Sequence, residues 1–158
     1  PFHSIPFHSV PQRLIPFREL SFDSISQNES LARSVAAAFS TQLNPTIGEL
    51  TDIRTAISEA VTNAIIHGYG NDPTQKVYMR CTAEDRLLTF EIEDKGKGIE
   101  NVALAIQPFY TTEPNLERSG MGFSVMEAFM DDVRVESEPG NGTRVTMKKS
   151  ISAVREDE

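Results

Sequence analysis

Residues 58–69 read SEAVTNAIIHGY, and they close a long segment with helical periodicity. This periodicity predicts a helix from about Ile47 to His67, which Gly68 ends. Its apolar side chains are Leu50, Ile53, Ile57, Ala60, Val61, Ala64 and Ile65. Glu59, Asn63 and His67 are spaced four residues apart, so on this helix they lie along one side, away from the centre of the apolar stripe. Taken alone, such a row is most often a solvated polar face.

Two glycine-containing segments are further candidates for a binding site. DKGKG (residues 94–98) follows a predicted strand, where Asp94 can accept a hydrogen bond from a ligand amine and the glycines let backbone approach a ligand. SGMGF (residues 119–123) opens a predicted helix, whose free N–H groups and dipole favour a phosphate. Arg118 precedes it and can pair with phosphate. Each signal is weak alone, since an ordinary turn or a surface ion pair explains it as well.

The composition indicates one soluble globular domain. The chain has 158 residues, 39% hydrophobic and 24% charged, with a net charge of −8. The acidic balance argues against a broad non-specific nucleic-acid binder. A single cysteine, Cys81, excludes a disulfide framework and a cysteine-based zinc cluster. No apolar run is long enough to span a membrane and no signal peptide is visible, so we expect a cytoplasmic protein.

The order of the predicted elements favours an α+β fold. A strand is expected at Leu20–Ile25, and Ser26 with Glu29 reads as a capping box that starts a helix to about Leu43. The apolar face predicted for this helix consists of Leu31, Val35, Ala38 and Phe39. The other expected elements are strands at Val77–Thr82 and Leu87–Glu93, a helix ending near Met130, and a hairpin of Val133–Ser137 with Thr143–Lys148. We expect a two-layer sandwich, with helices on one face of a mixed or antiparallel sheet.

The two ends of the chain differ from its middle. Four prolines fall in residues 1–16, which predicts a disordered arm or tag. Residues 17–150 are the expected domain, and 151–158 the expected charged tail.

The absence of several motifs excludes the enzyme classes that need them. The chain lacks the P-loop of P-loop ATPases, the HRD and DFG motifs of common protein kinases, the HExxH motif of zinc metalloproteases and the GxSxG motif of serine hydrolases.

Four motifs in order resemble the Bergerat-type ATP-binding fold of gyrase, Hsp90, histidine kinases and MutL. They are E-x-x-x-N-x-x-x-H on a helix, D-x-G-x-G after a strand, G-x-G opening a helix, and G-T before a strand, from Glu59 to Thr143. Within that superfamily, SEAVTNAIIHGY, PFYTTEPNLERSGMGF and MEAFMDDVRVES are similar to the sporulation anti-sigma factors, which are serine kinases. The likeness runs from about Leu20 to Lys149.

The resemblance implies an ATP site that also uses Mg²⁺. It makes Glu59 the general base for the attacking serine, Asn63 the Mg²⁺ ligand, and Asp94 the acceptor for the adenine amine. Arg118 would contact the γ-phosphate, and residues 99–119 would form a lid over ATP. Arg33 matches a position that contacts protein partners. The remaining implied nucleotide-binding residues are Gly96, Gly98, Thr112, Ser119, Gly120, Met121, Gly122, Phe123 and Thr143.

The resemblance also implies partners. A sigma factor of the sigma-F type would be bound and inhibited, and an anti-anti-sigma antagonist protein would be phosphorylated on serine. The resemblance implies that the protein forms a homodimer. We expect it to bind neither nucleic acid nor membranes directly. Two alternatives stay open: a general-stress anti-sigma kinase, and a sigma-binding module that uses ATP without transferring phosphate. The only histidine in a predicted helix is His67, inside the ATP motif, which argues against autophosphorylation on histidine.

Overall fold

The computed structural model describes residues 15–16, 19–106 and 122–153. The helical elements are α1 (Gln27–Ser40), the 3₁₀ turn η1 (Thr41–Leu43), α2 (Ile47–Asn63), the π-helical turn η2 (Ala64–Gly68), α3 (Val102–Ala105) and α4 (Gly122–Phe129). The strands are β1 (Ile15–Pro16), β2 (Leu20–Asp23), β3 (Lys76–Glu84), β4 (Leu87–Asp94), β5 (Asp132–Glu138) and β6 (Gly142–Ser150).

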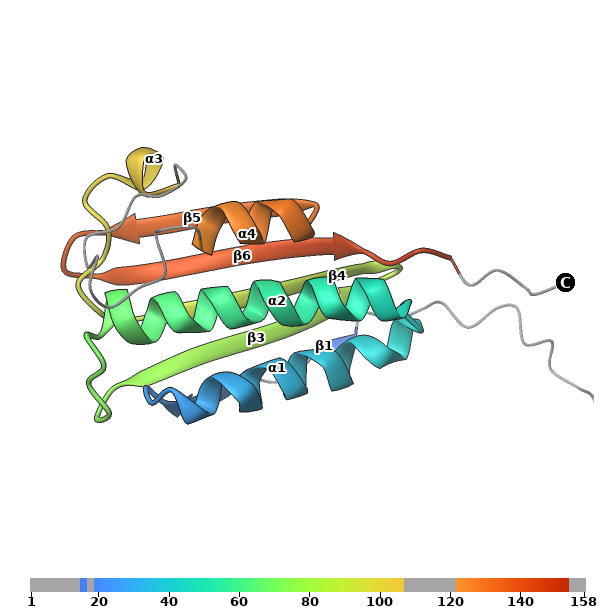
Figure 1. Cartoon of the computed structure of the whole chain (residues 1–158), viewed down its shortest axis with the longest axis horizontal. Coiled ribbons are helices and arrows are strands. Elements are labelled where there is room, and N and C mark those ends of the chain that lie inside the picture. Colours follow the sequence, from blue (N-terminus) through green and yellow to red (C-terminus); the bar gives the residue numbers. More distant parts are fainter. Residues whose placement is uncertain (1–14, 17–18, 107–121, 154–158) are drawn as a thin grey trace, which may run out of the picture.

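The strands form one sheet in the order β1-β3-β4-β6-β5, and β2 also pairs with β3. Every pairing between the described strands is antiparallel. The helices α1, α2 and α4 lie on one face of this sheet (Figure 1). The predicted α+β sandwich with helices on one face is therefore confirmed, and its sheet is of the antiparallel kind. None of the helices in the described ranges is long and apolar enough to cross a membrane.

The core lies between the sheet and the helices. Alternate residues of β3 and β4 point toward the helices, as the period of two requires, and they are the ones that are buried. The core side chains of these two strands are Val77, Met79, Cys81, Ala83, Leu88, Phe90 and Ile92. The stripe predicted for α2 packs onto them, with Ile53, Ile57 and Val61 fully buried and Leu50 half-buried. The sequence pattern thus gave the orientation of α2 correctly.

The capping box predicted at Ser26 is wrong. Ser26 has helical dihedrals (φ −59°, ψ −30°) and its side chain caps no N–H. The carboxylate of Glu29 instead accepts a hydrogen bond from Ser58 on α2 and pairs with Arg33 at 3.3 Å. Glu29 therefore binds Ser58 on the neighbouring helix instead of capping its own helix. The spacing of Ser26 and Glu29 in the sequence carries no information about this tertiary contact. A capping box does open α2, where the Thr46 hydroxyl accepts from the Glu49 N–H at 3.1 Å.

The apolar face predicted for α1 is also partly wrong. Leu31 is 46% exposed and Ala38 is exposed, whereas Phe39 is buried as predicted and Val35 is half-buried. The buried positions next to them are Ala32 and Ala36, which are 0% exposed. Small alanine side chains let α1 pack closely against its neighbours. The helix therefore turns its alanine face toward the core, and Leu31 is left facing outward.

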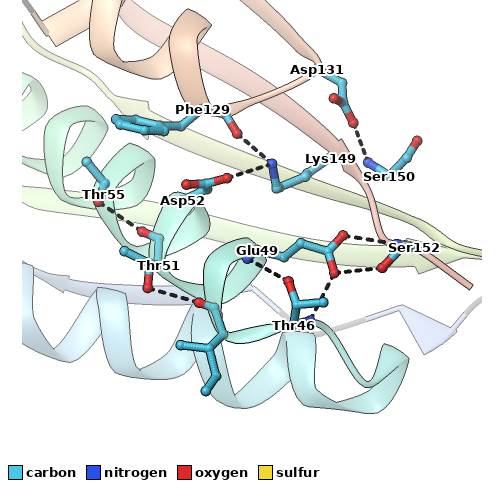
Figure 2. A network of polar contacts seen from close by, with 11 residues as sticks. Thr46, Glu49, Thr51, Asp52, Thr55, Phe129, Asp131, Lys149, Ser150 and Ser152 are labelled. Carbon is cyan, nitrogen blue, oxygen red and sulfur yellow. Dashed lines mark hydrogen bonds and ion pairs between the residues drawn. The ribbon is translucent and has the colours of Figure 1, made fainter. Parts of the chain in front are cut away.

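The packed chain extends past residue 150, where the charged tail was expected to begin. Ile151 is buried, and its N–H donates to the Arg86 carbonyl at 2.8 Å. Ser152 binds the Glu49 carboxylate through its N–H at 2.9 Å and its hydroxyl at 3.0 Å (Figure 2). These contacts join the end of β6 to the start of α2.

A buried lysine joins three elements on the helix side of the sheet. The Nζ of Lys149 donates to the Phe129 carbonyl at 2.7 Å and pairs with the Asp52 carboxylate at 3.3 Å (Figure 2). Lys149 is 8% exposed. Its charge lies at the C-terminal end of α4, where the helix dipole favours a cation. The side chain therefore links β6, α2 and α4.

We expect Lys149→Ala to lower the free energy of unfolding by about 2 kcal/mol, because the Phe129 carbonyl and the Asp52 carboxylate each lose a partner. Asp52 is 33% exposed, which keeps the loss below that of a fully buried pair. Thermal unfolding should shift down by about 4–8 °C. The control is Lys148→Ala, on the opposite face of the sheet, with an expected change within about 0.5 kcal/mol. Equal shifts in the two variants would contradict the role given to Lys149.

Candidate functional site

A cavity of about 370 Å³ opens at one end of the helix layer. It lies where the end of α2 with η2, the loop after β4, the start of α4 and the β5–β6 turn meet. Its polar lining includes Asn63, His67, Asp94 and Thr143. Its apolar lining includes Ala64, Ile92, Ile99 and Phe123. An apolar pocket of this size with a few convergent polar groups is typical of a small-molecule site.

Asp94 is the buried carboxylate of this cavity. It is the last residue of β4 and is 4% exposed. Its Oδ1 accepts the N–H of Gly96 at 2.9 Å, and the backbone N–H of Thr143 also donates to the carboxylate. Burial nevertheless raises the pKa of Asp94 to about 6, since the loss of solvation outweighs these two hydrogen bonds. The carboxylate retains acceptor capacity on the cavity side for a ligand that donates a hydrogen.

A π-helical turn ends the second helix, where a continuous α-helix to His67 was predicted. The N–H of Tyr69 donates to the Ala64 carbonyl at 3.1 Å, five residues back. Such turns are frequent at functional sites. The Gly68 carbonyl then accepts the Lys97 N–H at 3.0 Å, and the Tyr69 hydroxyl accepts the Lys95 N–H at 2.6 Å. The wider turn thus joins the end of the helix to the loop that follows Asp94.

Close backbone contacts explain why glycines surround the cavity. A Cβ at Gly68 would lie 2.5 Å from the Asp94 carboxyl carbon, and one at Gly96 would lie 1.8 Å from the Gly68 carbonyl oxygen. Gly98 has φ +74°, and its Cβ would lie 2.0 Å from the Glu138 oxygen. At Gly122 a Cβ would lie 2.8 Å from the Asn63 amide nitrogen. Gly96 and Gly98 were predicted to let the backbone approach a ligand, and their lack of a side chain also lets other parts of the chain come close.

Comparisons with known proteins identify the family. The histidine kinase-like ATPase domain family matches residues 25–149. The chain is 55% identical over 131 residues to the anti-sigma F factor of Clostridium novyi, a match that covers 83% of this chain and 92% of that protein. It is 57% identical over 129 residues to the anti-sigma F factor of Geobacillus sp. strain WCH70, covering 82% and 88%. The chain belongs to the anti-sigma F factor family.

The predicted resemblance to the sporulation anti-sigma factors and to the Bergerat-type fold is thereby confirmed. A crystal structure of full-length ShkA in complex with AMPPNP is also similar, with a TM-score of 0.52 and 21% identity. That match covers 89% of this chain and 32% of the ShkA chain. At this identity it supports the fold alone, and the fold agrees with a histidine kinase-like ATPase domain.

The structure of this anti-sigma F family member brings most of the described candidates to one place. Asn63, Asp94, Gly98, Gly122, Phe123 and Thr143 line the cavity. Gly96 packs beside it against Gly68. Glu59 is half-buried on α2, one turn before Asn63, and is not among the described residues that line the cavity. Arg33 lies apart from these residues on α1, with its side chain 41% exposed.

Five predicted residues lie outside the described ranges, which leave out 107–121. They are Thr112, Arg118, Ser119, Gly120 and Met121.

Sequence reasoning missed two residues that shape the site of this family member. Gly68 was read only as a helix stop, although it packs on Asp94. Ser137 was read as strand sequence, although its hydroxyl contacts Thr143. No local signal singles out Ser137, because its partners are remote in sequence or across a hairpin.

Proposed function

We propose that this protein binds ATP with Mg²⁺ in the cavity around Asp94 and transfers phosphate to a serine of an antagonist protein. We further propose that it binds and inhibits a sigma factor of the sigma-F type. The observation that carries the proposal is the buried Asp94 carboxylate, facing a cavity in a histidine kinase-like ATPase domain. A sigma factor acts in the cytoplasm, where we place this protein as well.

The residues around Asp94 fit an adenine base. A buried carboxylate with free acceptor capacity suits the exocyclic amine of adenine, which donates hydrogen bonds. Ile92, Ile99 and Ala64 give the planar ring an apolar surface. The volume of about 370 Å³ lies within the range of small-molecule pockets. Thr143, beside Asp94 in the β4–β6 pairing, would bind the same end of the base.

The residues at the other end fit phosphate and a cation. Gly122 starts α4, whose N-terminal N–H groups and dipole favour an anion. Asn63 lies against Gly122 and offers an amide oxygen. Within the described residues no group of three acidic, histidine or cysteine side chains gathers at a metal position. Mg²⁺ often has few protein ligands and completes its octahedron with phosphates and water, so Asn63 fits as its one ligand here.

The proposed chemistry assigns a separate task to each residue. ATP would supply its γ-phosphoryl group and leave as ADP, and Mg²⁺ would neutralise part of the phosphate charge. Glu59 accepts the proton of the attacking serine hydroxyl on its carboxylate. Arg118 pairs with the γ-phosphate, and residues 99–119 exclude water. For Arg118, Thr112, Ser119, Gly120 and Met121 the support is the sequence resemblance, since they lie outside the described residues.

The proposal that the protein binds a sigma factor is supported by the names of its relatives and by the charge of its surface. The relatives that match over most of their length are named anti-sigma F factor, which favours the sporulation type over the general-stress type. The exposed Arg33 is the proposed partner contact, and a homodimer is the proposed assembly. The net charge of −8 is suited to basic partner surfaces.

Phosphate transfer tests the enzymatic part of the proposal. The protein is mixed with Mg·ATP and a purified candidate antagonist, and phosphoserine on the antagonist is measured by mass spectrometry. We expect phosphoserine that needs ATP, Mg²⁺ and the protein together. ATP binding without any phosphoserine, across all antagonist candidates of a sigma-F system, would favour a non-catalytic sigma-binding module. Calorimetry with purified sigma-F-type factor, with and without ATP, tests the inhibitory part.

A further inference from the structure

The hydroxyl of Tyr69 binds the backbone at the ends of two neighbouring strands. Tyr69 directly follows η2 and is half-buried. Its hydroxyl donates to the carbonyl of Lys76, the first residue of β3, at 2.5 Å. The same oxygen accepts the N–H of Lys95 at 2.6 Å. Because Lys95 directly follows Asp94, the second hydrogen bond holds the peptide group that joins Asp94 to the loop after β4.

The two hydrogen bonds of Tyr69 are compatible with one hydroxyl. A phenol has one proton to donate, and its oxygen can accept as well. The Lys76 carbonyl is an acceptor only and the Lys95 N–H is a donor only, so each uses a different capacity of the hydroxyl. Burial raises the pKa of Tyr69 above its ordinary value, which keeps the proton on the oxygen at neutral pH.

Lys95 is the central residue of a turn that the Asp94 side chain closes. Oδ1 of Asp94 accepts the N–H of Gly96 at 2.9 Å, two residues further along, as in an Asx turn. The direction of the carboxylate is therefore coupled to the position of the Lys95 peptide group. Tyr69 holds this peptide group from outside, since it is not among the described residues that line the cavity.

We propose that Tyr69 is a positioning residue for base recognition, because its hydroxyl holds the turn that directs the Asp94 carboxylate toward an amine on the bound base. This inference rests on the proposed ATP site and deepens it. It assigns part of the preference for a purine with an amine at position 6 to a residue that does not touch the purine.

The surrounding loop has supports that do not involve the Tyr69 hydroxyl. The Gly140 N–H donates to the Lys97 carbonyl at 2.7 Å, and the Lys97 N–H donates to the Gly68 carbonyl at 3.0 Å. The ring of Tyr69 packs against the core, and a phenylalanine keeps that contact. Removal of the hydroxyl should therefore act on the Lys95 peptide group rather than on the fold.

The test compares ATP with purine riboside triphosphate, in which a hydrogen replaces the amine at position 6. For the wild type we expect ATP to bind about 10- to 100-fold more tightly, the effect of a hydrogen bond to a charged group. In Tyr69→Phe we expect this preference to fall by about three- to tenfold, because the Asp94 carboxylate is no longer held toward the amine. The affinity for purine riboside triphosphate should change by less than about twofold, since this nucleotide has no amine to recognise.

The matched control is Tyr78→Phe. Tyr78 is also half-buried, and its ring lies 4.7 Å from the Nζ of Lys95, a contact that phenylalanine retains. The preference for ATP should stay within about twofold of wild type in this variant. An equal loss of preference in Tyr78→Phe would contradict a specific role of the Tyr69 hydroxyl.

The outcomes separate this inference from the proposed function. If Tyr69→Phe weakens both nucleotides by the same factor, or neither, Tyr69 does not position Asp94 and the inference alone is wrong. If the wild type binds neither nucleotide, the proposed ATP site fails and the inference fails with it. Should Tyr69→Phe unfold, replacement of Tyr69 by 4-fluorophenylalanine fills the volume of the hydroxyl, and the same comparison decides. Unfolding of both variants would make Tyr69 a residue of the fold only, which also overturns the inference.

Discussion

Glu59→Gln should retain ATP binding and lose phosphate transfer by about 10²- to 10⁴-fold, the usual contribution of a general base. The glutamine amide has nearly the same shape as the carboxylate, but it does not take up the serine proton. Glu59 is one turn from Asn63 on α2, so the change also leaves the proposed Mg²⁺ ligand in place. Transfer is measured under single-turnover conditions, and nucleotide binding by calorimetry on the same preparation.

The matched control for this prediction is Glu127→Gln, an exposed acid on α4. It removes the same charge without touching the site, so transfer should stay within about twofold of wild type. Wild-type transfer in Glu59→Gln would show that Glu59 is not the base. Loss of both binding and transfer would make Glu59 part of the binding site instead.

Asp94→Asn should weaken ATP binding by about 10- to 100-fold, since a hydrogen bond to a charged group contributes about 1.5–3 kcal/mol. The carboxylate accepts from the backbone of Gly96 and Thr143 and, in the proposed site, from the adenine amine. The asparagine side chain has one acceptor oxygen, and its NH₂ group opposes at least one of these donors. Calorimetric titration with ATP checks the loss, and unchanged affinity would exclude Asp94 from the site.

The pH dependence of stability gives a second test at Asp94. Its pKa is raised from 3.8 to about 6, so the folded state disfavours the ionised form. The contribution of the neutral group is fully present below pH 3.8 and is lost as the pH rises through about 6, a difference of roughly 3 kcal/mol. The difference in unfolding free energy between wild type and Asp94→Asn should therefore shift against the wild type between pH 4 and 7. Denaturant unfolding at four pH values measures it, and a constant difference would contradict the raised pKa.

Much of the fold was predictable because its signals are local. The apolar stripe of α2 has helical spacing, and the alternation of Leu88, Phe90 and Ile92 has the spacing of a strand with one buried face. The grouping of the four motifs at one site was predictable as well, since each motif places a glycine or an acidic residue near the end of a helix or strand. Asn63, Asp94, Gly122 and Thr143 come together at one cavity, although they are up to 80 residues apart in the chain.

The features that sequence reasoning missed depend on contacts between elements. Glu29 has the spacing of a capping box, but it binds Ser58 on another helix. Leu31 has the hydrophobicity of a core residue, but alanines allow a closer packing that leaves it exposed. The π-helical turn at Ala64–Gly68 has no pattern of its own, and its partners are in the loop after β4. Ser137 contributes to the site only through the hydrogen bonds that its hydroxyl makes with Ile99, Gly142 and Thr143 on neighbouring segments.

The most direct test of the account is a crystal structure of the protein with AMPPNP and Mg²⁺. We expect the base in the cavity between η2 and β6, with its amine about 3 Å from the Asp94 carboxylate. We also expect Mg²⁺ beside Asn63, with the phosphates at the start of α4. A nucleotide bound elsewhere, or a base whose amine points away from Asp94, would contradict the central claim that this cavity is the ATP site.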